Sequence, residues 1–555
     1  MATAEASSLP DQDIIIVGAG FGGCYALHSL RQQGYTAKIL DACDDFGGVW
    51  HMNRYPGVRV DSETPTYQFS TPSVRETFNF TERYSSGADM RRYFSHMADT
   101  LHLRKDTLFH QNVVDARYDD EAKTWVFKTE QGLTARSRFA VFATGSSNKV
   151  HVPEFKNKAA FKGRIIHPKA WPADLDLAGK RVGIIGQGSS GVQILQELAK
   201  TDSALTVFVR TPPHCLPMGQ CRIPADESEH QKSFLDAVFN HAKYASTTGY
   251  LWNAGISTLY AEHTPEQRRA LWEKLWQRRG FVFLSNLNYA DLTINEEANR
   301  AAWGFMAEKH RARMTDAAKR DIIVPLESDA FLFALRPTLE QDYYEMMDRP
   351  NVRLVNLKTS PIAEFTENGI VTDDGQQQTL HELDIIVSAT GYDAVTGALY
   401  DMNIRDRHGA LLQDKWRDGI ASYLGMMVPD MPNAFILYGP QAPTALANGP
   451  PFLELQVEFL TKLLARAEAE AEAEADDDDD DGSRAAAIEA TDAAAQDWRR
   501  RTTDIWSGSL ARHSQSWWVG ANIPGKKREP QIWAGGLEEW RRACDDALKD
   551  WSHFV

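Results

Sequence analysis

The sequence contains little cysteine and no arrangement of cysteines that is typical of a metal or disulfide site. Only five of its 555 residues are cysteine, and no two of them are spaced as Cys-x-x-Cys. An odd, scattered set of thiols indicates a reducing compartment, so we expect a cytoplasmic protein without a bound metal. The same absence excludes proteins that carry electrons through a pair of cysteines.

Long apolar runs and an excess of basic residues are also missing. No stretch reaches the roughly 18 apolar residues that a transmembrane helix needs, and residues 1–13 lack the apolar core of a secretory signal. We therefore expect no membrane partner. The formal net charge is −16, which gives no reason to expect a nucleic-acid partner. Nothing in the sequence indicates an oligomeric state.

The acidic charge is concentrated in one block. Residues 468–481 hold four glutamates and six aspartates, which account for ten of the sixteen excess negative charges. A block of like charges repels itself and buries no apolar surface. We expect residues 468–484 to form a disordered insertion.

A glycine-rich turn follows the first buried strand of the sequence. Gly18, Gly20 and Gly23 fit the pattern G-x-G-x-x-G. The first glycine permits the turn, the second lets backbone approach a pyrophosphate, and the third lets the helix pack against the strand. A second strand is expected over 35–40, and Asp41 at its end can accept hydrogen bonds from ribose hydroxyls.

The same pattern occurs a second time. Its residues are Gly186, Gln187, Gly188, Ser189, Ser190 and Gly191. Here the next strand, over 206–209, ends at Arg210 where the first copy has Asp41. A carboxylate repels a 2′-phosphate, whereas a guanidinium can bind one through two hydrogen bonds, and Thr211 can add a hydroxyl. The first copy is therefore predicted to bind FAD and the second NADP(H).

These motifs predict an α/β fold with two Rossmann-like dinucleotide-binding domains, the NADP domain nested within the FAD domain. A Trp-, Glu- and Arg-rich segment with few strand-like alternations adds a helical insertion. The expected bounds are 1–147 and 384–555 for the FAD domain, 148–224 and 321–383 for the NADP domain, and 225–320 for the insertion.

Two further patterns narrow the chemistry. F-x-G-x-x-x-H-x-x-x-W-P is matched by Phe161, Gly163, His167, Trp171 and Pro172. G-x-W-x-x-x-x-Y-P-G-x-x-x-D is matched by Gly48, Trp50, Tyr55, Pro56, Gly57 and Asp61. In both patterns the sequence resembles the Baeyer–Villiger monooxygenases, within the class B flavoprotein monooxygenases. The resemblance covers nearly the whole chain, apart from the acidic block and much of the helical insertion.

The resemblance implies a reaction and its reactants. In that family NADPH reduces FAD, O₂ forms a C4a-peroxyflavin, and a small-molecule ketone becomes an ester or lactone. Two catalytic residues are implied: Arg336, within a stretch like Phe331 to Pro337, and Asp61, which would orient it. A fixed cation there lowers the energy of negatively charged oxygen.

Further cofactor contacts follow from the resemblance. Those implied for FAD are Gly48, Val49, Trp50, Tyr67 and Val113. Trp517 would lie near the nicotinamide ribose, with packing as an equal alternative. His167 is expected to serve as a hinge or packing residue at the link between domains. The family usually has Lys where this chain has Leu335, so we expect a relaxed preference for NADPH over NADH.

Two alternatives remain open from sequence. A flavin monooxygenase that oxidises thioethers or amines uses the same cofactors, although Trp171, Pro172 and Arg336 argue against it. A protein that binds FAD and NADP without catalysis is the other. The joint presence of Asp61 and Arg336 argues against that second alternative.

Overall fold

Strand β1 (Gln12–Val17), which ends at the first glycine motif, lies within a seven-stranded sheet. The computed structural model describes residues 8–251, 257–285, 287–474 and 487–555. The strands follow the order β3-β2-β1-β6-β5-β4, and β17 also pairs with β6. Strand β1 is parallel to β2 and β6, whereas β4, β5 and β6 form an antiparallel meander. The other strands are β2 (Ala37–Leu40), β3 (Thr107–Leu108), β4 (Val113–Asp119), β5 (Thr124–Thr129), β6 (Thr134–Phe142) and β17 (Ala434–Ile436).

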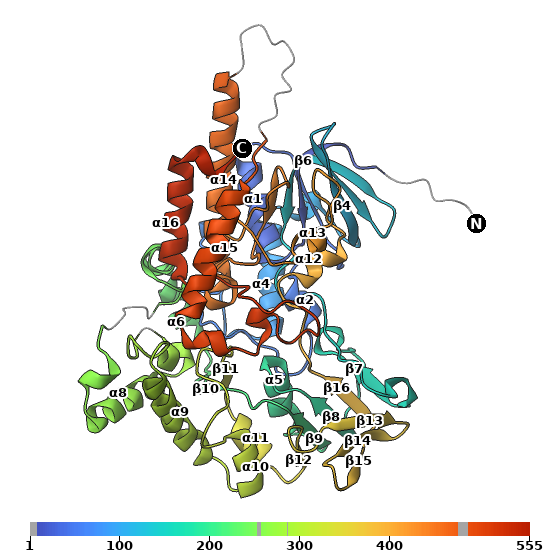
Figure 1. The fold of residues 1–555 in the computed structure, drawn as a ribbon, viewed down its shortest axis with the longest axis vertical. Coiled ribbons are helices and arrows are strands. Elements are labelled where there is room, and N and C mark those ends of the chain that lie inside the picture. The colour runs from blue at the N-terminus through green and yellow to red at the C-terminus, as the bar shows by residue number, and fades with distance from the viewer. Residues whose placement is uncertain (1–7, 252–256, 286, 475–486) are drawn as a thin grey trace.

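A second, fully parallel sheet carries the second glycine motif. Its order is β12-β9-β8-β16-β7. These strands are β7 (Arg164–Ile166), β8 (Arg181–Ile185), β9 (Ala204–Val209), β12 (Val352–Asn356) and β16 (Ile385–Ser388). An antiparallel sheet of β13 (Ile362–Thr366), β14 (Gly369–Asp373) and β15 (Gln378–Glu382) lies beside it in Figure 1. The predicted fold class, with one Rossmann-like unit nested in the other, is confirmed.

The predicted return to the first domain at residue 384 was too early. Strand β16 pairs with β8 and β7, so it belongs to the second sheet. A buried apolar run fits either parallel sheet equally well, and only the pairing decides between them. The chain therefore re-enters the first domain after Ser388.

Long helices cover the first sheet, as Figure 1 shows. They are α1 (Phe21–Gln32), α4 (Gly87–Thr100), α14 (Gly449–Glu474), α15 (Asp492–Ser507) and α16 (Gly536–Lys549). Shorter helices are α2 (Val49–Met52), α3 (Pro72–Arg75), α12 (Gly397–Asp401) and α13 (Leu412–Lys415). Helix α5 (Ser189–Leu198) follows the second glycine motif, and α11 (Tyr343–Met347) precedes β12.

Part of the segment expected to be disordered is helical. Helix α14 continues through Glu474, and the Glu468 carboxylate lies 3.1 Å from Nη1 of Arg138. Glu470 pairs with Arg466 one turn earlier at 2.9 Å. Alternating Glu and Ala are both strong helix formers, so helix propensity outweighs charge repulsion here. The rest of the predicted insertion, residues 475–484, lies outside the described residues.

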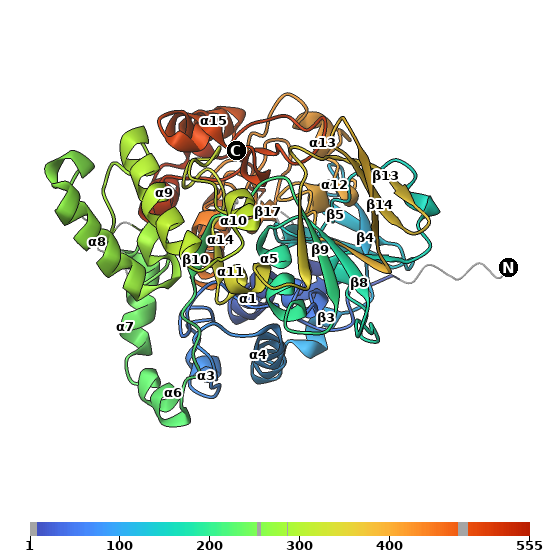
Figure 2. The ribbon, with the colours of Figure 1, turned by 90° about the horizontal axis from the view of Figure 1, so that it is seen from below.

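The region between β10 (Cys215–Pro217) and β11 (Thr338–Glu340) is mostly helical and forms a separate layer, on the left in Figure 2. Its helices are α6 (Ala225–Lys232), α7 (Leu235–Asn240), α8 (Pro265–Arg278), α9 (Glu296–Arg311) and α10 (Ala317–Ile323). The two flanking strands pair in parallel, which closes the insertion at its base. Among the described helices, none is both long and apolar enough to cross a membrane.

Candidate active site

The first glycine motif forms a tight backbone cradle between β1 and α1. Gly18 has φ +109°, and a Cβ there would lie 2.6 Å from the carbonyl oxygen of Ala143. A Cβ on Gly23 would lie 1.8 Å from the carbonyl oxygen of Gly18. Gly20 caps the N-terminus of α1 without a side chain in the way. This geometry fits a dinucleotide pyrophosphate, because free backbone N–H groups at a helix N-terminus bind anions.

Asp41 follows β2 and is fixed by backbone groups. Its Oδ2 accepts a hydrogen bond from the Ala19 amide at 2.6 Å, and its Oδ1 accepts one from the Cys43 amide at 2.7 Å. Each carboxylate oxygen keeps a second lone pair for a ribose hydroxyl. The Gln111 amide donates to the Asp41 carbonyl oxygen at 2.8 Å, so buried Val113, at the start of β4, lies near this strand end.

The loop that carries Gly48 packs against the first motif. Gly48 has φ +54°, and a Cβ on it would lie 3.2 Å from Cα of Gly20. Val49 and Trp50 begin helix α2 at this point. The Trp50 ring meets Tyr67 edge-on at a centroid distance of 5.8 Å. The structure thus gathers the predicted FAD contacts of this loop beside the pyrophosphate cradle.

The second glycine motif repeats the cradle in the second sheet. Gly186 has φ +94°, and a Cβ there would lie 2.6 Å from the carbonyl oxygen of Ala389. A Cβ on Gly191 would lie 2.3 Å from the carbonyl oxygen of Gly186, whereas Gly188 has nothing within 4 Å. Space is therefore open at the N-terminus of α5, as a second dinucleotide requires.

Side chains beside this cradle connect it to other parts of the fold. Gln187 accepts a hydrogen bond from the Tyr343 hydroxyl at 2.9 Å. The Ser189 and Thr338 hydroxyl oxygens are 3.2 Å apart. Ser190 donates to the Tyr55 hydroxyl at 3.2 Å. The segment that contains Arg336 and the Tyr-Pro-Gly loop therefore both reach helix α5.

Arg210 and Thr211 are exposed at the carboxyl end of β9. Within the described part of the chain, neither side chain makes a hydrogen bond, and Arg210 forms no ion pair. The guanidinium is thus available to an external anion. The carboxyl edge of a parallel sheet is also where nucleotides bind in such folds.

His167, which follows β7, contacts the segment after β16, where the chain returns to the first domain. Its Nε2 donates to the Gly391 carbonyl oxygen at 3.1 Å, and its Nδ1 accepts from the Lys169 amide at 3.2 Å. The His151 amide donates to the same Gly391 oxygen at 2.9 Å. Burial lowers the pKa of His167, so the ring is neutral near pH 7. This arrangement supports the hinge or packing role predicted for His167.

The Tyr-Pro-Gly loop holds the two domains together. The Tyr55 hydroxyl donates to Oε1 of Gln193 on α5 at 2.9 Å. A Cβ on Gly57 would lie 2.7 Å from the Gln193 carbonyl oxygen, so the loop fits only without a side chain there. The motif predicts Tyr55 and Gly57 but not their partner, because Gln193 lies in no motif of its own.

Asp61 and Arg336 form an ion pair across the domain junction. Oδ2 of Asp61 lies 2.6 Å from Nη2 of Arg336, and Nη1 of Arg336 donates to the Ala445 carbonyl oxygen. The guanidinium lies 5.8 Å from the centre of the Phe281 ring. Burial opposes the charge, but Asp61 and then Tyr250 raise the pKa of Arg336 above its ordinary value. Arg336 is therefore a permanent, oriented cation.

Tyr250 is a functional candidate that the sequence did not reveal. It comes from the helical insertion, and its hydroxyl oxygen lies 3.2 Å from Oγ of Ser62, next to Asp61 in the chain. Burial, and then the charge of Asp61, raise the pKa of Tyr250 to about 12. The phenol therefore stays protonated and can donate a hydrogen bond. No spacing pattern surrounds Tyr250, so no sequence signal could have marked it.

Trp517 lies half-buried in a cluster of aromatic side chains beside the Arg336 segment. Its ring meets Trp518 at 6.3 Å, and Trp518 in turn meets Trp506 edge-on at 6.1 Å. Oγ of Ser514 donates to the Ala334 carbonyl oxygen at 2.7 Å, which joins the two segments. The structure thus links the segment of Trp517 to the segment that contains Arg336.

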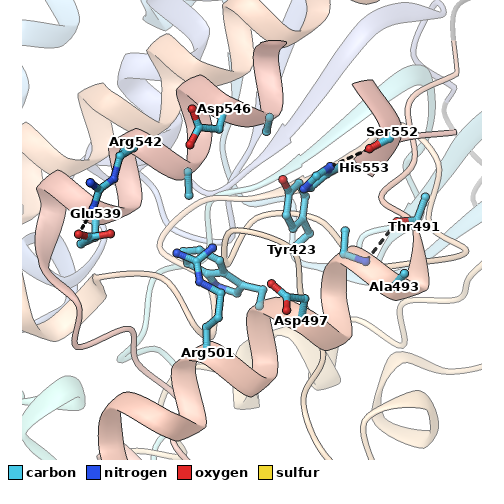
Figure 3. A pocket seen from close by; sticks show the side chains of 14 residues that line it. Tyr423, Thr491, Ala493, Asp497, Arg501, Glu539, Arg542, Asp546, Ser552 and His553 are labelled. Atoms are coloured by element: carbon cyan, nitrogen blue, oxygen red, sulfur yellow. Dashed lines mark hydrogen bonds and ion pairs between the residues drawn. The ribbon is translucent and has the colours of Figure 1, made fainter. Parts of the chain in front are cut away.

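A cavity of about 410 Å³ between α15 and α16 contains none of the predicted site residues. Figure 3 shows Tyr423, Asp497 and Arg501 at its wall. In the part of the chain that the structure describes, no group of three or more His, Cys, Asp or Glu side chains could hold a metal ion.

Comparisons with known proteins agree with this geometry. A family profile for an NAD(P)-binding Rossmann-like domain matches residues 16–81, and one for L-lysine 6-monooxygenase/L-ornithine 5-monooxygenase matches residues 70–280. Cyclopentanone 1,2-monooxygenase from Comamonas sp. (strain NCIMB 9872) is 37% identical over 527 residues, which cover 95% of this chain and 92% of the relative. A Baeyer–Villiger monooxygenase from Pseudooceanicola batsensis is 35% identical, with 97% and 95% covered.

A solved structure is similar over the whole fold. The crystal structure of OTEMO in complex with FAD and NADP has a TM-score of 0.90 and is 29% identical, covering 98% of this chain and 99% of that one. The similarity therefore extends over both dinucleotide-binding units and the helical layer.

Proposed function

Because this chain belongs to the Baeyer–Villiger monooxygenases, which oxidise ketones to esters or lactones, we propose that its catalytic centre is the ion pair of Arg336 and Asp61. The enzyme binds FAD and NADPH. When bound, NADPH supplies a hydride and FAD supplies the activation of O₂. The observation that carries the proposal is the 2.6 Å contact between the two side chains at the junction of both nucleotide units.

Arg336 stabilises negative charge that develops on oxygen during the reaction. A preorganised cation is worth more than one in bulk solvent, because it needs no reorganisation as charge appears. The raised pKa of Arg336 keeps the guanidinium charged at every working pH. Its planar group has five N–H donors: Nη2 donates to Asp61 and Nη1 to the Ala445 carbonyl oxygen, and Tyr250 also contacts the group.

Asp61 is the positioning partner of this cation. Its carboxylate holds one edge of the guanidinium, and the Ala445 carbonyl oxygen holds another. The Tyr250 hydroxyl, protonated near pH 7, accepts a hydrogen bond from Arg336. Together these contacts fix the direction in which Arg336 presents its remaining N–H groups.

The two nucleotide sites differ in the charge of the residue that ends their second strand, Asp41 in the first and Arg210 in the second. The first cradle, with Asp41, Gly48, Trp50, Tyr67 and Val113 around it, takes FAD. The second cradle takes NADPH, with Arg210 and Thr211 on the 2′-phosphate and Trp517 towards the nicotinamide ribose. The free guanidinium of Arg210 supports the preference for a 2′-phosphate.

The reactants are then a small-molecule ketone and O₂, with no nucleic-acid or membrane partner. A cytoplasmic location is consistent with the cysteines, all five of which are free thiols, with Cys24, Cys215 and Cys544 buried. A reducing compartment also supplies NADPH.

A ketone panel tests the proposal. Purified flavin-loaded enzyme is mixed with NADPH and air, with cyclopentanone, cyclohexanone, acetone or an aryl ketone added in turn, and products are identified by mass spectrometry. We expect at least one ketone to accelerate NADPH oxidation and to give ester or lactone that carries one atom from ¹⁸O₂. NADPH oxidation that every ketone leaves unchanged, with peroxide as the only product, would overturn it.

Oxidation of a soft nucleophile is a second candidate, because the profile for L-lysine 6-monooxygenase/L-ornithine 5-monooxygenase matches residues 70–280. That reaction does not require a fixed cation beside the flavin site. A thioether and an amine added to the same panel separate the two activities: if only these are oxidised, and still are after loss of the Arg336 charge, the second candidate holds.

A further inference from the structure

The proposed 2′-phosphate site of Arg210 contains fewer cations than its ligand requires. A phosphate monoester carries about −1.5 to −2 charges near pH 7, and one guanidinium balances only part of that charge. The residue just before Arg336, where the resemblance predicts a lysine, is the apolar Leu335. A second cation must come from elsewhere if this edge of the sheet is to favour NADPH.

Strand pairing brings one lysine to this edge. Strand β12 runs parallel to β9, with Asn356 opposite Val209, and the Leu357 amide donates to the Val209 carbonyl oxygen at 2.8 Å. The turn that follows β12 therefore leaves the sheet beside Arg210, at its carboxyl edge. Lys358 is the second residue of that turn, and its amide is held by Oδ1 of Asn356 at 3.0 Å. Neighbouring strands are only about 4.8 Å apart, well within the reach of a lysine side chain.

The side chain of Lys358 forms only a weak, exposed ion pair. Its ammonium group pairs with the carboxylate of Asp329, and the two side chains are 46% and 78% exposed. An exposed ion pair contributes little because water and salt screen it. Lys358 can therefore exchange this carboxylate for a phosphate at small cost.

We propose that Lys358 is the second cation of the NADPH 2′-phosphate site, acting with Arg210 in place of the lysine absent at position 335. The inference rests on the proposed function of Arg210. The ammonium group leaves Asp329 when the phosphate binds, so Asp329 competes with the nucleotide for Lys358. This competition makes the preference for NADPH adjustable by a residue that does not itself touch the ligand.

Binding measured by isothermal titration calorimetry on the flavin-loaded enzyme tests the proposal without turnover. The titrants are NADP⁺, NAD⁺ and 2′,5′-ADP. Lys358→Ala should weaken binding of NADP⁺ and 2′,5′-ADP about tenfold and leave NAD⁺ unchanged, because only the first two carry the 2′-phosphate. Lys358→Arg should retain binding, and Asp329→Asn should tighten NADP⁺ severalfold.

A matched control is Lys180→Ala. Lys180 is also exposed and lies in the same domain, but it precedes β8 at the opposite, amino edge of the sheet. That variant should bind all three titrants as the parent enzyme does. Raising the salt concentration should weaken NADP⁺ less in Lys358→Ala than in the parent enzyme, because one charge fewer is screened.

The outcomes distinguish a failure of the Lys358 inference from a failure of the Arg210 assignment. NADP⁺ affinity within twofold of the parent in Lys358→Ala would overturn the inference, and if Arg210→Ala still weakens NADP⁺ at least tenfold, the proposed role of Arg210 stands. If neither variant changes NADP⁺ binding, the 2′-phosphate is not bound at this edge and both assignments fail. Equal weakening of NAD⁺ and NADP⁺ by Lys358→Ala would indicate a disturbed fold and would also contradict the inference.

Discussion

Oδ2 of Asp61 and Nη2 of Arg336 lie 2.6 Å apart although 275 positions separate them in the sequence. The contact joins the loop after the first glycine motif to the segment that leaves the helical insertion. The carbonyl oxygen of Ala445, from a third part of the chain, also accepts a hydrogen bond from the guanidinium. The proposed catalytic centre thus forms only when the two nucleotide units are packed together.

Removing the charge of Asp61 should loosen this arrangement. Asp61→Asn keeps an acceptor for Arg336 but replaces a charge-assisted hydrogen bond with a neutral one, which costs roughly 1 kcal/mol or more. We expect ester formation to fall about tenfold while NADP⁺ affinity and flavin content stay unchanged. Asp174→Asn, at an exposed aspartate in the linker to the second sheet, is the control. Parent-like kcat in Asp61→Asn would contradict the positioning role.

The sequence predicted the parts of the molecule that local chemistry determines. Both glycine cradles were predicted, because a tight strand-to-helix turn needs glycine at Gly18 and Gly186, and both adopt positive φ. The contrast between Asp41 and Arg210 likewise depends on charge alone. These features need no knowledge of the tertiary fold.

The sequence did not predict the long-range contacts. An apolar strand does not encode which sheet it joins, so β16 was assigned to the wrong domain. Tyr250 and Ala445 meet Arg336 only through tertiary packing, and neither lies in a spacing pattern. The acidic block begins as helix, through Glu474, because helix propensity outweighs charge repulsion there, and the charge of the block alone does not predict this.

A buried ion pair between the helical layer and the first domain should be essential for stability. The Glu454 carboxylate is fully buried on α14, accepts hydrogen bonds from the amide and hydroxyl of Ser70 at 2.6 Å each, and lies 3.2 Å from Nζ of Lys243. Lys243→Ala would leave that charge without its cation. The free energy of unfolding should fall by about 3–5 kcal/mol. Urea unfolding followed by tryptophan fluorescence measures the loss.

Two variants control this experiment. Lys462→Ala removes an exposed lysine from the same helix and should change the free energy of unfolding by at most about 0.5 kcal/mol. Lys243→Met combined with Glu454→Gln and Glu458→Gln removes the lysine and both carboxylates that it pairs with, and should recover much of the loss. A single Lys243→Ala variant as stable as the parent would show that the pair contributes nothing.

Two buried histidines should make the helical layer sensitive to acid. Burial lowers the pKa of His214 to about 4 and that of His310 to about 3, and Nε2 of His310 donates to the Cys215 carbonyl oxygen at 2.9 Å. Both values lie below the ordinary pKa of about 6.5, so protonation favours the unfolded chain. Their contribution to stability is complete above pH 6.5 and is lost as the pH falls towards 4 and 3.

Comparison of variants isolates this effect from the titration of carboxylates. The free energy of unfolding is measured between pH 7.5 and 4.5 for the parent, for His310→Gln and for His408→Gln, which alters an exposed histidine. The parent should lose up to about 1.4 kcal/mol more per pH unit below 6.5 than His310→Gln does. The His408→Gln curve should run parallel to the parent. Parallel curves for all three proteins would refute the assignment.

The central claim is that Arg336 provides the charge on which ester formation depends, and the rate of ester formation by Arg336→Ala tests it most directly. The variant is first reduced by NADPH without oxygen, then mixed with air and ketone, and the ester is quantified by mass spectrometry. We expect flavin to remain bound and to be reduced, while ester formation falls by about two to three orders of magnitude, the usual cost of removing one preorganised oxyanion donor. Ester formation at near the parent rate would contradict the account and would require another cation at the catalytic centre.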